Sequence, residues 1–400
     1  MRTIQLKQVL SLAAAAALVS TMAACADASS SGTSRAGGAC ELKLGTLGPL
    51  TGAAADFGLS MQATAKFVAN EANQKGGLQV GDKKCHVSVS SYDTGYTSAG
   101  AAEAANDFAS KGIKFVIGPL GATELTGMKP VAARYGMLLD ANGFGRDALE
   151  KKYPLVFHLG PGPYVWAGPI IDEAAKHFHF KNVTVIATDD ESGDDIAIVN
   201  AQQFKKRGYN VTRQTYPRGT TDFSPIVSRL LQTDPDEIDF ASSPAGDVGT
   251  MIKLLRGAGY KGVFSRLGGD STAEITKVAG QSTMKNFFFY APVDFDQPSV
   301  KKILPTFKKV TGMDATGIAL GWIPGARALL DAISKAGTID DTEKVAAQFR
   351  KEDLKDSLLG QGVWTGKEEF GVNQEMSWPF NIGLIQNGQG PTYKQLSPES

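Results

Sequence analysis

From about residue 40 onward, short runs rich in β-branched and aromatic residues alternate with longer stretches that have helical periodicity. This alternation is typical of a parallel sheet covered by helices on both faces. A first series predicts strands at 42–45, 86–91, 114–117 and 137–140, separated by helices at 59–75, 98–111 and 126–135. A second series predicts helices at 168–178, 196–207, 223–232 and 248–258, with strands at 183–187, 210–216, 237–241 and 263–266. The sequence therefore predicts an α/β protein with two doubly wound parallel-sheet lobes, each with its ligand edge at the carboxyl ends of the strands.

The chain continues after the second series, with a further helix predicted at 318–336 and a hairpin signal at Asn387-Gly388. This returning chain implies several crossovers, so we expect a multi-strand hinge between the lobes. The expected segments are a signal peptide (1–24), a flexible tether (25–39), lobe I (40–160 plus 291–357) and lobe II (161–290 plus 358–395).

The composition narrows the possible functions. The 400 residues are 42% hydrophobic and 20% charged, which is enough apolar material for a sizeable core and excludes disorder over the whole chain. Lys+Arg and Asp+Glu both number 41, so the basic excess of a nucleic-acid-binding protein is missing. Four histidines and three cysteines leave little material for a metal centre, and we expect neither a metal nor a cofactor.

The N-terminus has the pattern of an export signal. Arg2 and Lys7 precede an apolar run at 9–19, which is about half the ~20 residues that a membrane span needs. The segment 22–25 looks like a bacterial lipobox, in which Cys25 becomes the lipid-carrying N-terminus; ordinary signal cleavage nearby is the alternative. Both interpretations place the protein outside the cytoplasmic membrane, on the periplasmic or cell-surface side, and lipidation would anchor it to a membrane.

The other two cysteines are candidates for a disulfide. Cys40 and Cys85 each precede a predicted strand, and neighbouring parallel strands would bring the two starts together in an oxidising compartment. Closing this loop would stabilise the fold by ~4 kcal/mol on the chain-entropy model. Two separate buried thiols are the alternative.

The motifs of common enzyme classes are missing. Residues 143–148 have the glycine spacing of a dinucleotide-binding fingerprint, but Pro154 soon interrupts the chain and no acid-bearing strand follows. We therefore expect a glycine loop that lets a ligand approach the backbone. His177 and His179 are two positions apart, a spacing that points them to different faces of a helix, so we expect surface or helix-capping histidines and not ligands.

Two further features have alternative interpretations. The carboxylate pairs 189–190 and 194–195 predict a solvated loop and a helix start, with contact to a cleft as the alternative. The aromatic run 287–290 predicts a buried strand, with a shelf for a ligand as the alternative.

Five ordered motifs resemble the leucine/isoleucine/valine-binding family of ABC-transporter solute receptors. They lie at 44–58, 70–77, 116–119, 219–224 and 268–270, and the resemblance extends over about residues 41–390. It implies a type I periplasmic-binding-protein fold, which closes its two lobes on one small ligand and presents that ligand to a membrane permease.

The resemblance also implies ligand contacts in the first lobe. Phe57 stands where the family has an aromatic residue beside the bound amino acid. The loop 118–124, which includes Leu120, Ala122 and Thr123, stands where the family holds the α-carboxylate, with Ala122 in place of a serine.

Further positions follow from the same resemblance. Gly143 and Gly145 occupy the positions where the family has a contacting backbone carbonyl and a threonine side chain. Ser192 and Pro244 occupy the positions of two tyrosines. Asp270 occupies the position of the acid that pairs with the α-ammonium group. Because Ala122 and Gly145 have no hydroxyl, the usual clamp on an amino-acid headgroup is lost, whereas Asp270 keeps an ammonium partner possible.

Three more residues near the expected cleft suggest another ligand class. Tyr164 and Trp166 would provide flat apolar walls, and Arg146 would bind a carboxylate in a bidentate fork. The alternative is that the two aromatic residues pack at the hinge and that Arg146 is solvated.

These features predict an extracytoplasmic solute-binding lipoprotein of an ABC importer, and not an enzyme. Its ligand would be a hydrophobic amino acid or another small carboxylate, which includes aromatic carboxylates. The expected partners are this ligand, the permease with its ATPase subunits, and the membrane through the lipid on Cys25; we expect a monomer that binds no nucleic acid. A ligand-binding component of a sensory system is the alternative.

Overall fold

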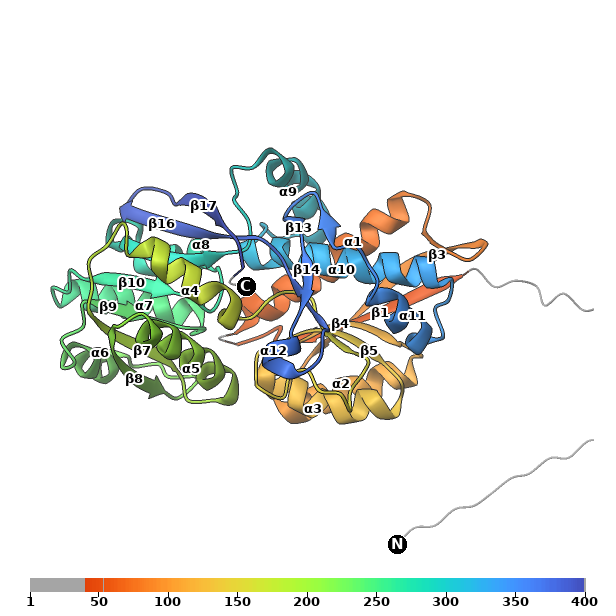
Figure 1. Cartoon of the computed structure of the whole chain (residues 1–400), viewed down its shortest axis with the longest axis horizontal. Coiled ribbons are helices and arrows are strands. Elements are labelled where there is room, and N and C mark those ends of the chain that lie inside the picture. Colours follow the sequence, from red (N-terminus) through yellow and green to blue (C-terminus); the bar gives the residue numbers. More distant parts are fainter. Residues whose placement is uncertain (1–39, 53, 399–400) are drawn as a thin grey trace, which may run out of the picture. The chain divides into compact units, whose positions relative to one another are not determined.

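The computed structural model describes residues 40–52 and 54–398. The expected signal peptide, the tether and Cys25 lie outside the described residues. Strands and helices build two α/β lobes, each around its own sheet (Figure 1). This confirms the predicted fold class.

The sheet of lobe I has eight strands in the order β14-β15-β6-β5-β4-β1-β3-β2. Its strands are β1 (Glu41–Gly48), β2 (Leu78–Val80), β3 (Lys83–Asp93), β4 (Phe115–Leu120), β5 (Leu138–Asn142), β6 (Val156–His158), β14 (Val363–Thr365) and β15 (Glu375–Ser377). Neighbouring strands from β3 to β15 pair in parallel, and the edge strands β2 and β14 pair antiparallel.

Helices cover both faces of this sheet. They are α1 (Ala55–Gln74), α2 (Ser98–Ser110), α3 (Gly121–Arg134), α9 (Pro298–Thr311), α10 (Gly317–Ala336), α11 (Thr342–Phe349) and α12 (Lys367–Phe370). Apolar residues of α1, α9, α10 and α11 form the core on one face, and those of α2 and α3 form the core on the other. A small hairpin, β12 (Lys355–Asp356) and β13 (Gly360–Gln361), stands apart from the sheet.

The sheet of lobe II has seven strands in the order β17-β16-β11-β10-β9-β7-β8. They are β7 (Asn182–Thr188), β8 (Asn210–Tyr216), β9 (Glu237–Asp239), β10 (Val263–Arg266), β11 (Lys285–Ala291), β16 (Phe380–Asn387) and β17 (Thr392–Leu396). One face is covered by α4 (Pro163–Ala174) and α5 (Glu191–Lys206), and the other by α6 (Ser224–Leu231), α7 (Ala245–Gly257) and α8 (Thr272–Ala279). A 3₁₀ turn, Gln281–Thr283, precedes β11. The predicted hairpin at Asn387-Gly388 joins β16 to β17.

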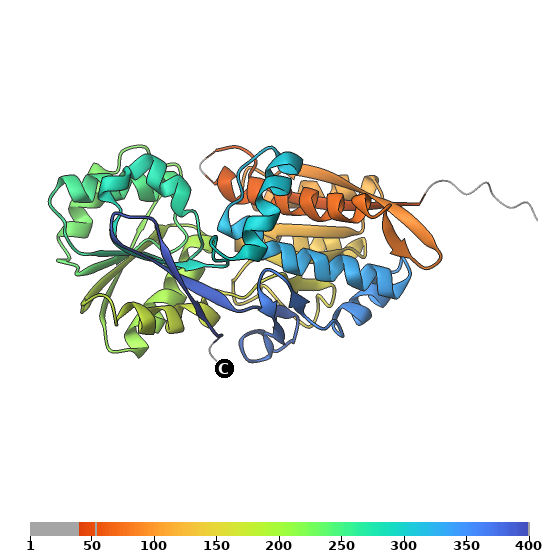
Figure 2. The ribbon, with the colours of Figure 1, turned by 90° about the horizontal axis from the view of Figure 1, so that it is seen from above.

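The chain passes between the lobes three times, through residues 159–162, 292–297 and 378–379. Figure 2 shows these connections from a second side. The expected assignment of 358–395 to lobe II needs a correction, because β14 and β15 extend the sheet of lobe I through the pairing of Glu375 with His158. Leu358 and Leu359 also pack in the core of lobe I, so the last boundary lies at 378–379.

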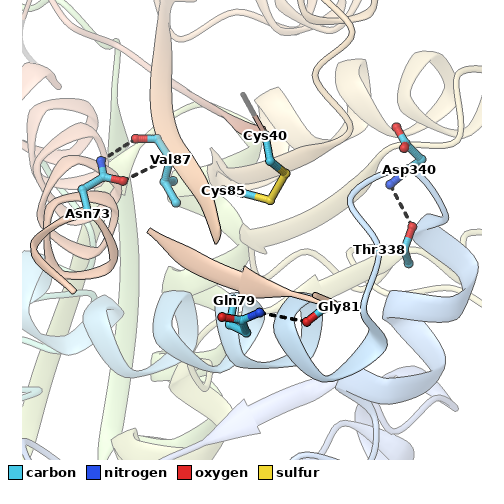
Figure 3. The surroundings of a disulfide bond; sticks show 8 residues. All are labelled: Cys40, Asn73, Gln79, Gly81, Cys85, Val87, Thr338 and Asp340. Atoms are coloured by element: carbon cyan, nitrogen blue, oxygen red, sulfur yellow. Dashed lines mark hydrogen bonds between the residues drawn. A yellow bond between two sulfur atoms is a disulfide. The ribbon is translucent and has the colours of Figure 1, made fainter. Parts of the chain in front are cut away.

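The disulfide between Cys40 and Cys85 is present, with a Cα–Cα distance of 4.3 Å (Figure 3). It joins the start of β1 to the neighbouring parallel strand β3, as predicted. The His86 amide also donates to the Cys40 carbonyl, and the Asn73 side chain exchanges two hydrogen bonds with the backbone of Val87.

Asp140, in the central strand β5, is fully buried, and neither of its carboxylate oxygens has a hydrogen-bond partner among the described residues. Burial raises the pKa of Asp140 well above its ordinary value, because the charged form loses its hydration. The folded state therefore keeps a proton that the unfolded chain releases above pH ~3.9.

We expect Asp140→Asn to change how stability depends on pH. In the wild type, the proton on Asp140 makes the free energy of unfolding fall by up to about 1.4 kcal/mol per pH unit as the pH rises above the unfolded pKa. The variant lacks this contribution, so it should lose less stability than the wild type between pH 5 and pH 7 in urea unfolding. Asp82→Asn, at an exposed site, is the control. Equal losses in the wild type and Asp140→Asn would show that Asp140 is ionised in the folded protein.

Candidate ligand-binding site

A cavity lies between the lobes at the carboxyl ends of both sheets. The space between its walls amounts to roughly 950 Å³, a volume that includes open solvent. All three connections contribute to its walls, through Gly160 and Pro161, Pro292, and Trp378 with Pro379. The first turns of α1, α3, α4 and α5 contribute most of the predicted ligand contacts that line the cavity.

Many of the large side chains in the lining are aromatic. Seven aromatic side chains from both lobes and from the connections contribute to it: Phe57, Tyr96, Phe144, Trp166, Tyr290, Trp322 and Trp378. Aromatic walls of this kind favour a ligand with a flat or bulky apolar body.

Trp166 organises the aromatic wall on the side of lobe II. Its indole stacks on the Tyr290 ring with the centroids 3.9 Å apart, and the Phe144 ring from lobe I meets it edge-on at 5.7 Å. The indole nitrogen donates to the carbonyl of Leu267, next to the glycines of the 268–269 loop. The hydrogen bond and both ring contacts fix the orientation of Trp166.

Arg266 lies under Phe57. Its fully buried guanidinium donates to the carbonyls of Gly269 and Ser243 and lies 5.5 Å from the Phe57 ring centroid. Asp56, next to Phe57 in the first turn of α1, accepts a hydrogen bond from Ser271 of lobe II. Burial raises the pKa of Asp56, although the positive charge of Arg266 opposes this shift. These contacts join α1 of lobe I to lobe II.

Arg218 is the one cationic side chain among the described residues that line the cavity. It donates to Asp190 over 2.6 Å and to the Thr188 hydroxyl over 2.9 Å, and its guanidinium lies 4.6 Å from the centroid of the Tyr96 ring. Burial raises the pKa of Tyr96 to about 12, so this phenol stays neutral. Arg218 is therefore ion-paired with Asp190, and its guanidinium is the cationic group that a ligand would meet at this end of the cavity.

The first turns of α3 and α5 meet across the lobes beside Arg218. The Ser192 hydroxyl of α5 lies 3.4 Å from both the backbone nitrogen and the hydroxyl of Thr123 in α3. Gly121 has a φ of +75°, and a Cβ there would lie 2.4 Å from the Tyr96 hydroxyl, so this close approach requires glycine. Both helix starts direct partial positive charge toward the cavity.

Asp195 is the acidic side chain of the lining. It lies in α5, three residues after Ser192, and its Oδ2 is buried without a hydrogen-bond partner among the described residues. Burial raises the pKa of Asp195 to about 6, and the negative charges of Glu191, Asp147 and Asp194 act in the same direction.

The structure brings five of the eleven predicted ligand contacts to the cavity lining: Phe57, Leu120, Ala122, Trp166 and Ser192. The segment expected as a loop at 118–124 is the end of β4 and the first turn of α3. Thr123, Gly143 and Gly145 lie next to the lining but do not contribute to it.

Three other predicted contacts lie elsewhere. Arg146 is exposed, which agrees with the solvated alternative. The Tyr164 hydroxyl donates to Glu375 of lobe I, and its ring packs against Phe370. Of the two aromatic residues expected as cavity walls, Trp166 therefore lines the cavity and Tyr164 does not.

Asp270 also lies outside the lining. Its Oδ1 accepts hydrogen bonds from the amide and the hydroxyl of Thr272, and a Cβ at Gly317 would lie 2.0 Å from its Oδ2. Burial raises the pKa of Asp270 to about 6. This acid packs against the start of α10 and does not contribute to the cavity lining, although the neighbouring Gly268 and Gly269 do.

Several lining residues were not predicted: Tyr96, Asn142, Phe144, Arg218, Trp322 and Trp378. For Arg218 and Asn142 a signal existed, because both lie at the carboxyl ends of strands. For the carboxylate pair 194–195 and the aromatic run 287–290, the structure agrees in part with the alternative interpretation. Asp195 contacts the cavity, and the run 287–290 is a buried strand whose last residue, Tyr290, also contributes to the lining.

Two features are missing from residues 40–52 and 54–398 of the structure. No group of three or more His, Cys, Asp or Glu side chains in this part of the chain is arranged to hold a metal ion. None of the helices at 40–52 and 54–398 is long and apolar enough to cross a bilayer.

Comparison with known proteins identifies the family. A family model described as periplasmic binding protein matches residues 41–378. The Leu/Ile/Val/Thr-binding protein of Salmonella typhimurium is 25% identical over 343 residues, which cover 83% of this chain and 90% of that protein. The Leu/Ile/Val-binding protein of Escherichia coli is 24% identical over 343 residues, with the same shares covered.

Solved structures share the fold. The branched-chain amino acid transporter substrate binding protein of Streptococcus pneumoniae, in complex with isoleucine, has a TM-score of 0.75 at 18% identity and covers 90% of this chain and 100% of its own. A fatty acid ABC transporter substrate-binding protein from Thermomonospora curvata has a TM-score of 0.75 at 17% identity and covers 90% and 93%. The chain therefore belongs to the leucine/isoleucine/valine-binding family of periplasmic binding proteins, whose members are substrate-binding proteins and not enzymes.

Proposed function

We propose that the protein is the solute receptor of an ABC importer and that it captures a small carboxylate with a bulky apolar body, in the first instance an aromatic one. The observation that carries this proposal is the cavity with seven aromatic side chains and one cationic side chain among its described lining residues. A hydrophobic amino acid and an aromatic carboxylate both have these two parts.

The proposed pose follows from the distribution of charge. The carboxylate would lie at Arg218 and the first turn of α3, where a side-chain cation and a helix start coincide. The apolar body would lie against Trp166 and Tyr290 on one side and Phe57 on the other. Ala122 removes the hydroxyl that the family resemblance places at the carboxylate, so Arg218 takes a larger share of the binding.

The proteins of known structure that share this fold support a receptor role in which the ligand differs between proteins. One protein of the same fold was solved with isoleucine and another is named as a fatty acid receptor, and both have the same TM-score to this chain. The fold thus accommodates apolar carboxylates of different shapes. Export through residues 1–24, anchoring through Cys25 and delivery to a permease complete the proposal.

The test is a thermal-shift screen followed by calorimetry on the purified protein. A ligand at 100 times its dissociation constant adds ~2.7 kcal/mol to the free energy of unfolding. We expect shifts with phenylalanine or 3-phenylpropionate, which combine a ring and a carboxylate, and none with acetate or glycine. Shifts confined to sugars, polyamines or metal ions would contradict the proposed ligand class.

Arg218→Gln should weaken binding of the same ligands by roughly tenfold to 100-fold, because a hydrogen bond to a charged group contributes about 1.5–3 kcal/mol. Arg213→Gln is the matched control, since Arg213 is on the same lobe, is paired with Asp194 and does not line the cavity. Equal affinities of wild type and Arg218→Gln in calorimetry would place the carboxylate elsewhere.

A further inference from the structure

Glu124 is a buried acid that the proposed pose does not use. It lies in the first turn of α3, its side chain is fully buried, and it does not contribute to the cavity lining. Both of its carboxylate oxygens accept hydrogen bonds: Oε2 from the backbone N–H of Leu120 over 3.0 Å, and Oε1 from the hydroxyl of Thr94. An ionised carboxylate fits these two donors, because it accepts at both oxygens and donates at neither.

The hydrogen bond to Thr94 continues to Tyr96. The Thr94 hydroxyl donates to Glu124 and accepts a hydrogen bond from the backbone N–H of Tyr96 over 3.2 Å. Tyr96 has a φ of +59°, a left-handed conformation that a bulky residue rarely adopts and that its surroundings must hold in place. Glu124 therefore orients the hydroxyl that fixes this strained turn.

Leu120 and Tyr96 belong to the two sides of one close contact in the cavity wall, and both contribute to the lining. Gly121, which follows Leu120, approaches Tyr96 so closely that a Cβ at Gly121 would lie 2.4 Å from the phenol oxygen. The centroid of the Tyr96 ring lies 4.6 Å from the guanidinium of Arg218 in lobe II. One carboxylate thus holds both sides of this contact, at the end of the cavity where Arg218 lies.

We propose that Glu124 is a positioning residue for ligand binding: its ionised carboxylate holds Tyr96 and the start of α3 in the arrangement that receives the ligand beside Arg218. The inference rests on the proposed function, to which it adds a residue outside the cavity lining. A protonated Glu124 would meet two donors with a donor of its own, so one of the two hydrogen bonds would be lost. Ligand binding should therefore favour the ionised form.

The surroundings of Glu124 place its titration near neutral pH. Burial raises the pKa of Glu124 to about 7, although the two hydrogen bonds act in the opposite direction. Asp93, at the end of β3, adds a negative charge that also raises this pKa, and Tyr96 stays neutral. The face of α2 toward α3 consists of alanines and Phe108, and β4 and β5 pack against α3 with apolar residues. Glu191 of α5 contacts α3 two residues after Glu124.

The first test is the pH profile of ligand binding. Calorimetry on the full chain would measure L-phenylalanine and 3-phenylpropionate at pH 8 and at pH 6, with the wild type, Glu124→Gln and Glu343→Gln. With a pKa of about 7, the ionised fraction of Glu124 falls about tenfold between these two pH values. The dissociation constant of the wild type should therefore rise severalfold, up to about tenfold, more than that of Glu124→Gln. Asp195 titrates in all three proteins, so the comparison isolates Glu124.

Glu343→Gln is the matched control. Glu343 is also a glutamate in the first turn of a helix of lobe I, α11, but it is exposed and lies outside the cavity lining. Its substitution should keep both the affinity and the pH profile of the wild type. A merely structural role of Glu124 would weaken binding equally at both pH values, so a wild-type pH profile in Glu124→Gln would overturn the inference.

Variants of Thr94 test the path from Glu124 to Tyr96. Thr94→Val nearly keeps the shape of the buried side chain but removes the hydroxyl, whereas Thr94→Ser keeps the hydroxyl. We expect Thr94→Val to weaken binding at pH 8, as Glu124→Gln does, and Thr94→Ser to bind nearly as tightly as the wild type. If Glu124→Gln does not fold, this pair of variants decides the inference.

The double variant of Thr94→Val and Glu124→Gln should bind no more weakly than the weaker of the two single variants. Both changes break the same chain of hydrogen bonds, so their effects should not add. Additive losses of affinity would contradict the path through Thr94.

Amide hydrogen exchange tests the positioning without a ligand. The amides of Leu120 and Tyr96 are the donors that Glu124 holds, the first directly and the second through Thr94. In mass spectrometry of the full chain at pH 8, peptides with these amides should exchange about tenfold faster in Glu124→Gln than in the wild type, and peptides from lobe II should not. Unchanged exchange at both amides would sink the inference.

The outcomes separate the inference from the proposed function. If the probes bind but the wild type and Glu124→Gln share one pH profile, the inference fails and the proposed function stands. If neither probe binds, the proposed ligand class fails, and amide exchange decides whether Glu124 holds this part of the cavity wall.

Discussion

A variant with Cys40→Ser and Cys85→Ser should lose about 4 kcal/mol of unfolding free energy. The disulfide closes a loop with a sequence separation of 45 residues. In the chain-entropy model such a crosslink lowers the entropy of the unfolded chain, which raises the free energy of unfolding by about 4 kcal/mol. The neighbouring contacts between β1 and β3 do not depend on the sulfur atoms, so the folded structure should persist.

Urea unfolding under oxidising conditions would measure this loss. A reducing agent should lower the stability of the wild type toward that of the double variant and should leave the double variant unchanged. A loss of less than about 1 kcal/mol would show that the unfolded chain is already compact around this loop or that the folded bond is strained. Ligand binding should change little, because the cavity lining includes neither cysteine.

Trp166→Ala should reduce both stability and binding. The indole is almost completely buried, stacks on Tyr290 and meets Phe144 of the other lobe, so its removal leaves a large hole in the wall of the cavity. Phe- or Trp-to-Ala substitutions in cores typically cost 3–5 kcal/mol. We expect a loss of about 3 kcal/mol or more in urea unfolding and a loss of at least 100-fold in affinity for whichever aromatic probe binds.

Trp166→Phe is the matched variant. It keeps a ring between Tyr290 and Phe144 but removes the N–H that donates to Leu267, so it should lose less stability and retain measurable binding. If Trp166→Ala binds an aromatic probe as tightly as the wild type, the ligand does not lie against this wall.

Apolar periodicity predicted the presence of these helices but not the residues at which they begin. Those expected at 59–75, 126–135, 168–178 and 196–207 all exist, but α1, α3, α4 and α5 begin four or five residues earlier. Apolar periodicity reports the face of a helix that packs on a sheet. The first turns of these helices face the cavity and the other lobe, so their small, polar and aromatic residues do not follow that period.

The same reason explains why some predicted ligand contacts do not line the cavity. Asp270 matches a family motif in the sequence, but its carboxylate accepts a hydrogen bond from Thr272, packs against Gly317 and is not part of the cavity lining. Tyr164 and Trp166 are two positions apart on α4, and a helical turn directs one to Glu375 and the other to Tyr290. Spacing alone does not distinguish these orientations.

The sequence by itself determined the α/β class and the two lobes, and it predicted the family and the pairing of Cys40 with Cys85, because each depends on local periodicity, on ordered motifs or on the starts of neighbouring strands. Only the tertiary structure decided which side chains meet in the cavity. Tyr96 and Arg218 come from different lobes, and Asp195 is covered by Gly145 of the other lobe. Such contacts join residues more than 45 positions apart, and they exist only once three connections bring the carboxyl ends of two sheets together.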